Sequence, residues 1–222
     1  QLSLTKFLLV VDRSVDLRDF RAVLEHVLER TDVATDLFVL ANLSMDTLDY
    51  TGPTVNEGSK GVWLGLGEPR RELPREFRAD RVPSGVKDVR VFCGGCLVVE
   101  TASAADEPDA GARLAADPAF REWPLVVLTD DAGRAAASPM NFLWTTFTRF
   151  EPAADVHAAG RRVVRNHVVY EAPVLIDARL APDFPEELFC DETTAATVTR
   201  RWREYFPAGD VEMGDSDLAH LD

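Results

Sequence analysis

The sequence predicts an α/β fold in which a mixed, mainly parallel sheet with flanking helices is built from two similar strand–helix–strand units. The first observation is a continuous apolar run, Phe7–Val11, which is typical of a strand covered on both faces. The second is the amphipathic run that follows, residues 17–28, with apolar residues at helical spacing. The third is that this outline occurs twice, in residues 3–70 and again in residues 124–182.

Aligned motifs carry the repeat. KFLLVVD and the later DLRDFRAVLEHVLER of the first copy match LVVLTDD and SPMNFLWTTFTR of the second. RTDVATD at residues 30–36 then aligns with RFEPAAD at residues 149–155. A repeat of this length predicts two similar half-sheets packed into one body. The alternative is a chance likeness between two ordinary βαβ units.

Within the first copy, Asp16 is the expected cap of the helix. Residues 37–40 form the expected next strand, residues 42–50 are rich in turn formers, and residues 62–64 form a further strand. In the second copy, Ser138 before a proline predicts a helix start, although FLWTTF alone is typical of a strand. We therefore expect a helix there.

Between the copies, residues 67–87 predict a surface excursion with at most a short helix near residues 71–77. Paired strands are expected over residues 89–101. After the second copy, residues 191–206 predict a final helix that could pack against another subunit, and residues 207–222 predict a flexible acidic tail. The expected domain is therefore residues 1–206.

Composition excludes several classes of protein. The chain has 222 residues, 46% of them hydrophobic and 28% charged, which is typical of a globular protein. A net charge of −14 argues against nucleic acid and anionic membrane surfaces as partners. No apolar run reaches the roughly 20 residues of an integral membrane segment, and the start lacks the features of a signal peptide. The first residue is Gln1, so we expect a fragment or a processed product.

The three cysteines are too few for a disulfide framework and favour a reducing, cytoplasmic setting. Cys93 and Cys96 form a CxxC motif, which is compatible with a redox pair or half of a zinc site. The motif lies between two strand-like runs, so a Gly-Gly hairpin turn flanked by two small apolar residues explains it as well. The absence of a second CxxC favours the hairpin.

Charged residues follow the expected buried strands, at Asp12-Arg13 and at Asp130-Asp131. Ligands of parallel sheets gather at these strand ends, so an acid–base site is one interpretation. Helix capping is the other, and it is favoured because no histidine or metal-ligand spacing accompanies the carboxylates. No phosphate-binding or nucleophile-elbow motif occurs either. The residues alone therefore predict neither an active site nor a metal site in this chain.

The order of several motifs resembles a known family. They are TKFLLVVDRSVDLRDFRAVLEHVLERTDVATD, LDYTGPTVNEGSKG, TRFEPAAD and NHVVYEAPVLIDARLAPDFP. Together they resemble the carboxyl-terminal domain of UbiD-like decarboxylases, in a long-form member, over residues 3–206. The resemblance implies a part of a carboxy-lyase that acts reversibly on aromatic or α,β-unsaturated acids, such as 4-hydroxybenzoate-type or polyprenyl-hydroxybenzoate substrates.

The resemblance also implies cofactors and partners. Family enzymes use prenylated FMN with a divalent metal and potassium, held with the Glu-Arg-Glu catalytic set in other domains. This chain would then close the substrate pocket and help subunits associate, with a flavin-binding domain or subunit as its partner and a homo-oligomer as its state. We expect no catalytic residue in this chain and no cofactor bound to it alone. A stand-alone assembly or regulatory module with the same fold is the alternative.

By resemblance, the strand after Gly58-Ser59-Lys60 approaches the substrate, which makes Lys60, Trp63 and Leu64 the pocket candidates. Secondary candidates are Asp12, Arg13 and Asp177. The family's L-D-A-T-like strand end reads Trp-Leu-Gly-Leu here, whereas Ile-Asp-Ala-Arg occurs in the second copy. Which copy faces the flavin domain therefore stays open.

Overall fold

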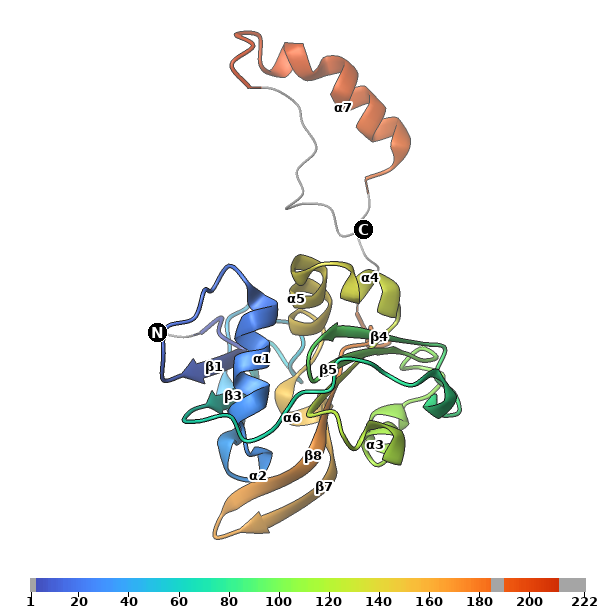
Figure 1. The fold of residues 1–222 in the computed structure, drawn as a ribbon. Coiled ribbons are helices and arrows are strands. Elements are labelled where there is room, and N and C mark those ends of the chain that lie inside the picture. Colours follow the sequence, from blue (N-terminus) through green and yellow to red (C-terminus); the bar gives the residue numbers. More distant parts are fainter. Residues whose placement is uncertain (1–2, 185–189, 212–222) are drawn as a thin grey trace. The chain divides into compact units, whose positions relative to one another are not determined.

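The computed structural model describes residues 3–184 and 190–211, which fall into two compact units, Gln1–Pro182 and Asp183–Asp222 (Figure 1). The first unit contains two β-sheets and their helices. The described residues of the second include the helix α7 (Glu192–Tyr205). None of the described helices is long and apolar enough to cross a membrane.

The smaller sheet has three strands in the order β1-β3-β2. They are β1 (Phe7–Val11), β2 (Leu37–Ser44) and β3 (Glu57–Gly65). β1 runs parallel to β3, and β2 runs antiparallel to it. The connection from β1 to β2 is made by α1 (Phe20–Arg30) and the short α2 (Val33–Asp36).

The larger sheet has the order β4-β5-β6-β8-β7. Its strands are β4 (Asp88–Cys93), β5 (Cys96–Glu100), β6 (Leu125–Thr129), β7 (Val156–Val164) and β8 (His167–Asp177). The central strands β5, β6 and β8 are parallel, whereas β4 and β7 pair antiparallel with their neighbours. The predicted α/β class with mixed strand directions and flanking helices is confirmed, but the strands form two sheets, and neither sheet is mainly parallel. In the larger sheet the antiparallel edges follow from short hairpins at Gly94-Gly95 and at Arg165-Asn166, because a two-residue turn joins antiparallel strands. In the smaller sheet a longer loop, residues 45–56, joins the antiparallel β2 and β3.

Strands β6-β8-β7 have the same order and directions as β1-β3-β2. Between β6 and β7 the chain forms α4 (Ala132–Ala137), α5 (Pro139–Phe147) and the short α6 (Pro152–Asp155). The motifs RTDVATD and RFEPAAD fold alike: Asp32 N donates to Asp36 Oδ2 at 2.8 Å, and Glu151 N donates to Asp155 Oδ2 at 2.6 Å. Each motif thus ends in an aspartate that closes one helical turn.

Capping explains where the helices begin. Ser138 Oγ accepts from Asn141 N at 3.1 Å, so the predicted helix over FLWTTF is confirmed as α5. The expected cap of α1 was wrong: Asp19 accepts from Ala22 N at 3.1 Å, and Asp16 instead accepts from Arg18 N in the preceding turn. Residues 71–77 form no helix, and Pro74 in the middle of this stretch disfavours one.

One hydrophobic core joins the two sheets. Side chains of α1 and β3, including Leu28 and Trp63, belong to the same buried cluster as Val98, Val127 and Ile176 of the larger sheet. A second cluster covers the other face of the larger sheet through α3 (Ala110–Ala115) and two aromatic residues after it. Its members include Leu97, Leu114, Phe120, Trp123, Val126, Leu128 and Leu175.

In the second unit, Asp191 caps α7 by accepting from Thr194 N at 2.9 Å, so the helix expected over residues 191–206 is confirmed. Trp202 lies 4.6 Å from Phe206, ring centroid to ring centroid. No residue of α7 is buried. Most of the predicted acidic tail, residues 212–222, lies outside the described residues.

Candidate functional site

The pocket candidates on β3 lie on opposite faces of the smaller sheet. Trp63 is 1% exposed and packs against Phe7 with ring centroids 6.2 Å apart. Its Nε1 is buried and has no hydrogen-bond partner among the described atoms. Strand alternation places Lys60 and Leu64 on the other face. Lys60 Nζ donates to the backbone oxygens of Thr5 and Ser3.

Asp12 and Arg13 directly follow β1 and contact residues 67–68, which follow β3. Asp12 Oδ2 accepts from Gly67 N at 2.7 Å, and this hydrogen bond holds the pKa of Asp12 below its ordinary value. Arg13 lies 3.4 Å from Asp12 and 3.3 Å from Glu68. All three side chains are exposed, and Asp177 belongs to the other sheet. The structure therefore does not bring the secondary candidates together.

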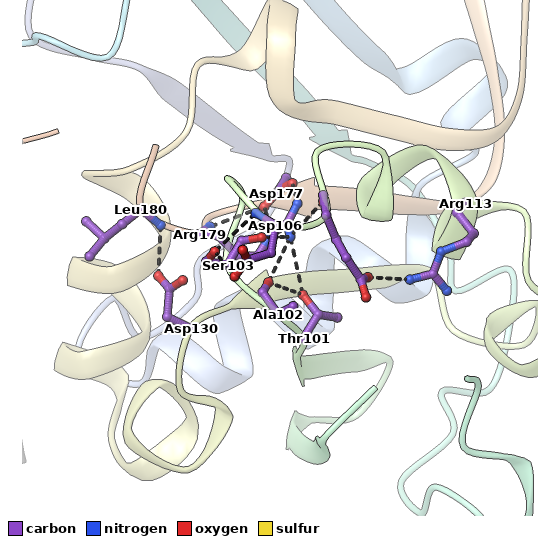
Figure 2. A network of polar contacts seen from close by, with 10 residues as sticks. Thr101, Ala102, Ser103, Asp106, Arg113, Asp130, Asp177, Arg179 and Leu180 are labelled. Atoms are coloured by element: carbon purple, nitrogen blue, oxygen red, sulfur yellow. Dashed lines mark hydrogen bonds and ion pairs between the residues drawn. The ribbon is translucent and has the colours of Figure 1, made fainter. Parts of the chain in front are cut away.

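Asp177 instead ends β8 inside a buried polar network around Arg179 (Figure 2). The Arg179 side chain is 1% exposed, and it donates to Asp177 at 2.9 Å from Nε and at 2.6 Å from Nη2. Its Nη1 donates to the carbonyl oxygens of Ala102, Ser103 and Glu107. Burial acts to lower the pKa of Arg179, but the hydrogen bonds and charge of Asp177 raise it on balance. Arg179 thus fastens the loop after β5 to the end of β8.

Asp130 directly follows the neighbouring strand β6, and its side chain is also held by a hydrogen bond and an ion pair. Its Oδ2 accepts from Leu180 N at 2.8 Å and lies 3.2 Å from the buried Arg149 (Figure 2 shows the Leu180 contact). Asp131 caps α4 by accepting from Arg134 N at 2.8 Å. The geometry of Asp130 and Asp131 therefore favours helix capping and charge balance over an acid–base site.

A second cluster of ionisable groups lies around Lys6 and α6. Lys6 Nζ lies 3.1 Å from Asp49 and donates to Thr51 Oγ1 at 2.8 Å, and burial lowers the pKa of Lys6. Burial raises the pKa of Asp155 to about 6, against the backbone hydrogen bond from Glu151, and the carboxylates of Asp177 and Glu151 add to the rise. Lys6, Glu151 and Asp155 are shielded from solvent and close together, so the charge of each affects the pKa of the others.

Above Lys6 the surface forms an apolar groove of about 290 Å³. Its rim consists of the exposed side chains Leu4, Leu48, Tyr50 and Trp144. Lys6 and Asp49 lie among the lining residues. Concave apolar surfaces with a few polar groups are typical of sites for small molecules. This groove could not be predicted from the sequence, because Trp144 and the loop of Tyr50 come from distant parts of the chain.

The cysteine hairpin is confirmed, with Cys93 and Cys96 paired across the turn between β4 and β5. Both thiols are free and buried. Burial raises the pKa of Cys96 well above its ordinary value, which opposes the thiolate that redox or zinc chemistry requires. Across the described ranges, no three His, Cys, Asp or Glu side chains are placed to hold a metal ion. These residues therefore do not fit the divalent metal that the resemblance implies for other domains.

Comparisons with known proteins extend this description. Residues 1–65 match the family described as 3-octaprenyl-4-hydroxybenzoate carboxy-lyase C-terminal domain, UbiD_C. A Chlamydia pneumoniae protein, named as a subunit of 4-hydroxybenzoate decarboxylase, is 42% identical over 207 residues, which are 93% of this chain and 35% of that protein. An uncharacterized protein of Chlamydia trachomatis serovar D is 45% identical over 208 residues, with the same two shares.

The open form of vanillic acid decarboxylase from Sedimentibacter hydroxybenzoicus is a more distant match. It has 16% sequence identity and a TM-score of 0.35, and the match covers 69% of this chain and 36% of that chain.

Residues 1–65 of the chain thus match the carboxyl-terminal domain of the UbiD family, which is the family that the motifs predict. The chain spans about a third of the length of the curated relatives it matches, since 35% of each is covered.

Proposed function

We propose that this chain is the carboxyl-terminal, pocket-closing and oligomerisation part of a UbiD-like carboxy-lyase. Its substrates are aromatic or α,β-unsaturated carboxylic acids of the 4-hydroxybenzoate type, and it acts with a flavin-binding domain or subunit. The observation that carries the proposal is the match of 93% of the chain to a protein named as part of a decarboxylase, of which it covers 35%. The remaining length of such a protein is ample for a flavin domain.

Prenylated FMN, with a divalent metal and potassium, supplies the electron sink for carbon dioxide loss when it is bound in the flavin domain. This chain contributes shape and exclusion of water. A desolvated apolar surface over the substrate favours decarboxylation, because charge disperses as carbon dioxide leaves.

The groove rimmed by Leu48, Tyr50 and Trp144 is the surface that we assign to pocket closure. It is concave and aromatic, so it suits the flat apolar body of an aromatic acid. Among the residues predicted from the sequence, Lys60 and Leu64 stay candidates for the substrate pocket, on the face of β3 that is opposite Trp63. Trp63 lies in the core and would act by supporting β3.

We also infer that the two similarly ordered sets of strands, residues 3–70 and 124–182, are copies of one unit. The common order, the common directions and the paired turns of α2 and α6 support this. The free cysteines support a reducing, cytoplasmic setting.

The alternative is a stand-alone assembly module that associates with a decarboxylase without closing its pocket. The test is decarboxylation of 4-hydroxybenzoate by the enzyme assembled with this chain, compared with the same enzyme carrying Trp144→Ala. We expect kcat/KM to fall about tenfold, which corresponds to about 1.4 kcal/mol. Val163→Glu, an exposed change on β7, is the control and should leave kcat/KM unchanged.

The chain purified alone should bind no flavin and should not decarboxylate the substrate. A yellow protein with tightly bound flavin would contradict the proposal. Unchanged kcat/KM in Trp144→Ala, with assembly intact, would favour the stand-alone module.

A further inference from the structure

β1 is an edge strand of the smaller sheet, and one of its two sides is unpaired. It lies at the end of the order β1-β3-β2, beside β3 (Figure 1). Its parallel register with β3 runs without a shift from Phe7 to Val11. Just before the strand begins, Gly61 N of β3 donates to Lys6 O at 2.9 Å.

The directions of the peptide groups along β1 follow from this hydrogen bond. In a parallel pair every second residue bonds to the neighbouring strand, so after Lys6 the peptide groups of Leu8 and Val10 also face β3. The described residues provide no hydrogen-bond partner for the N–H groups on the other side. These N–H groups are those of Phe7, Leu9 and Val11. A row of unpaired peptide groups of this kind is a template for another strand.

β1 also lacks the features that protect the other edges of the two sheets. β4 carries Asp88 and Arg90, and β7 carries two adjacent arginines. β2 is interrupted by a shift in register between Leu40 and Leu43. Charges and irregularities of this kind prevent an edge from pairing with another chain. Among the edge strands of residues 3–184, β1 alone has no charge, no proline and no break in its register.

The larger sheet shows the same arrangement with this edge occupied. Strands β6-β8-β7 have the order and directions of β1-β3-β2, so β6 corresponds to β1. The outer side of β6 is paired with β5, and the two strands are parallel. All five residues of β6 are buried, whereas none of β1 is, and Leu8 is 39% exposed. A parallel strand is therefore the cover that this edge has in the larger sheet.

The two faces of β1 indicate which side chains the added strand would carry. Three of its side chains pack against the buried cluster that joins the two sheets while staying partly exposed, and these are Phe7, Leu9 and Val11. A strand beside them continues the same face, so every second side chain of that strand should be apolar. β5 has this pattern, since Cys96 and Val98 belong to that cluster.

We propose that the outer edge of β1 binds an extended, apolar segment of the flavin-binding domain or subunit, which adds as a fourth strand parallel to β1. The inference rests on the proposed function, which supplies a flavin-binding partner, and it names the surface that receives this partner. The chain covers 35% of its named relative, so most of such a protein remains to supply the strand. Strand addition provides main-chain hydrogen bonds for the unpaired peptide groups and apolar contacts at alternate side chains.

The test is amide hydrogen exchange, measured residue by residue, in the 222-residue chain alone and in the enzyme assembled with it. In the chain alone, the amides of Phe7, Leu9 and Val11 should exchange fast, because they are unpaired. In the assembled enzyme these three amides should exchange at least tenfold more slowly. The amides of Leu8 and Val10 are bonded to β3 and should exchange slowly in both, which makes them an internal control.

Leu9→Pro removes the central unpaired N–H group of the edge. Proline is tolerated where the N–H of an edge strand faces outward, and circular dichroism checks the fold of the variant. In the assembled enzyme, the protection of Phe7 and Val11 should fall at least tenfold, because the added strand loses its central donor. Val11→Pro, at the end of the strand, makes the same test with less risk to folding.

Val163→Pro is the matched control. Val163 is exposed on the edge strand β7, and it precedes Val164, which pairs with His167 across the two-residue turn. Residues that flank such a turn bond to each other, so the N–H of Val163 also faces outward. This variant should leave the protection of β1 in the assembled enzyme within twofold.

Fast exchange of the three amides in an active assembled enzyme would overturn the proposal. So would protection that survives both Leu9→Pro and Val11→Pro, since a packed helix or loop would then explain it. Protection that rises with the concentration of the chain alone would identify a second copy as the occupant, and this too would overturn the proposal. None of these outcomes changes the decarboxylation test of Trp144→Ala. Failed strand addition and failed pocket closure are therefore distinguishable.

Discussion

Asp155→Asn should stabilise the protein at neutral pH but not at pH 4. Burial raises the pKa of Asp155 from 3.8 to about 6. In the window between about pH 4 and pH 6, the folded protein keeps this proton while the unfolded chain has released it. The free energy of unfolding therefore falls as pH rises through that window, and it stays lower above it. Asparagine is neutral at every pH and retains an oxygen to accept the 2.6 Å hydrogen bond from Glu151 N.

The size of the effect follows from the shift. Two pKa units correspond to about 3 kcal/mol, and because the residue is only half-buried we expect about 2 kcal/mol at pH 7.5. Urea unfolding should show a midpoint raised by about 1 M at pH 7.5 and nearly unchanged at pH 4. Asp36→Asn is the matched control, since Asp36 accepts the same hydrogen bond in α2. A variant that is destabilised at pH 7.5, or a difference that does not change with pH, would refute the reasoning.

Three further predictions concern the buried framework. Arg179→Met should lower the free energy of unfolding, measured by urea denaturation, by about 3 kcal/mol, because Asp177 would be left buried without its partner. Arg113→Met, at an exposed ion pair, is the control and should cost less than about 1 kcal/mol. Equal losses in the two variants would contradict a stabilising role for the buried Arg179–Asp177 pair. Gly65→Ala should lower the melting temperature by several degrees, because the added methyl group meets the α1 backbone, and an unchanged melting temperature would mean that α1 can move. A thiol reagent should modify Cys190 alone in the native protein and all three cysteines in denaturant; rapid native reaction of the hairpin cysteines would restore the redox interpretation.

The sequence predicted elements whose signals are local. Ser138 before a proline outweighed the strand propensity of FLWTTF, and α5 is a helix because the cap is satisfied. The hairpin at the cysteines followed from two glycines between apolar runs. The cap of α1 was misplaced because Asp16 and Asp19 both precede apolar residues, and the preceding turn decides between them.

Features that depend on contacts between distant segments could not be predicted. β7 contains VHAAGRRVV, which is too polar to read as a strand, and it is stabilised as an edge by pairing with β8. The burial of Arg179 could not be predicted from the sequence, because several of its hydrogen-bond partners are carbonyl groups of a loop some 70 residues earlier. Trp63 was assigned to a pocket by resemblance, and only the packing of Phe7 shows that it lies in the core.

The core shared by both sheets has a consequence for how this protein can be divided. The family match ends at residue 65, but Leu28 and Trp63 belong to the same buried cluster as Val98 and Ile176. A fragment ending there would expose that surface to water and would not fold autonomously. Truncated variants should therefore keep residues 1–182 together, and chimaeras should exchange them as one unit. The limit of sequence similarity is not a limit of cooperative folding.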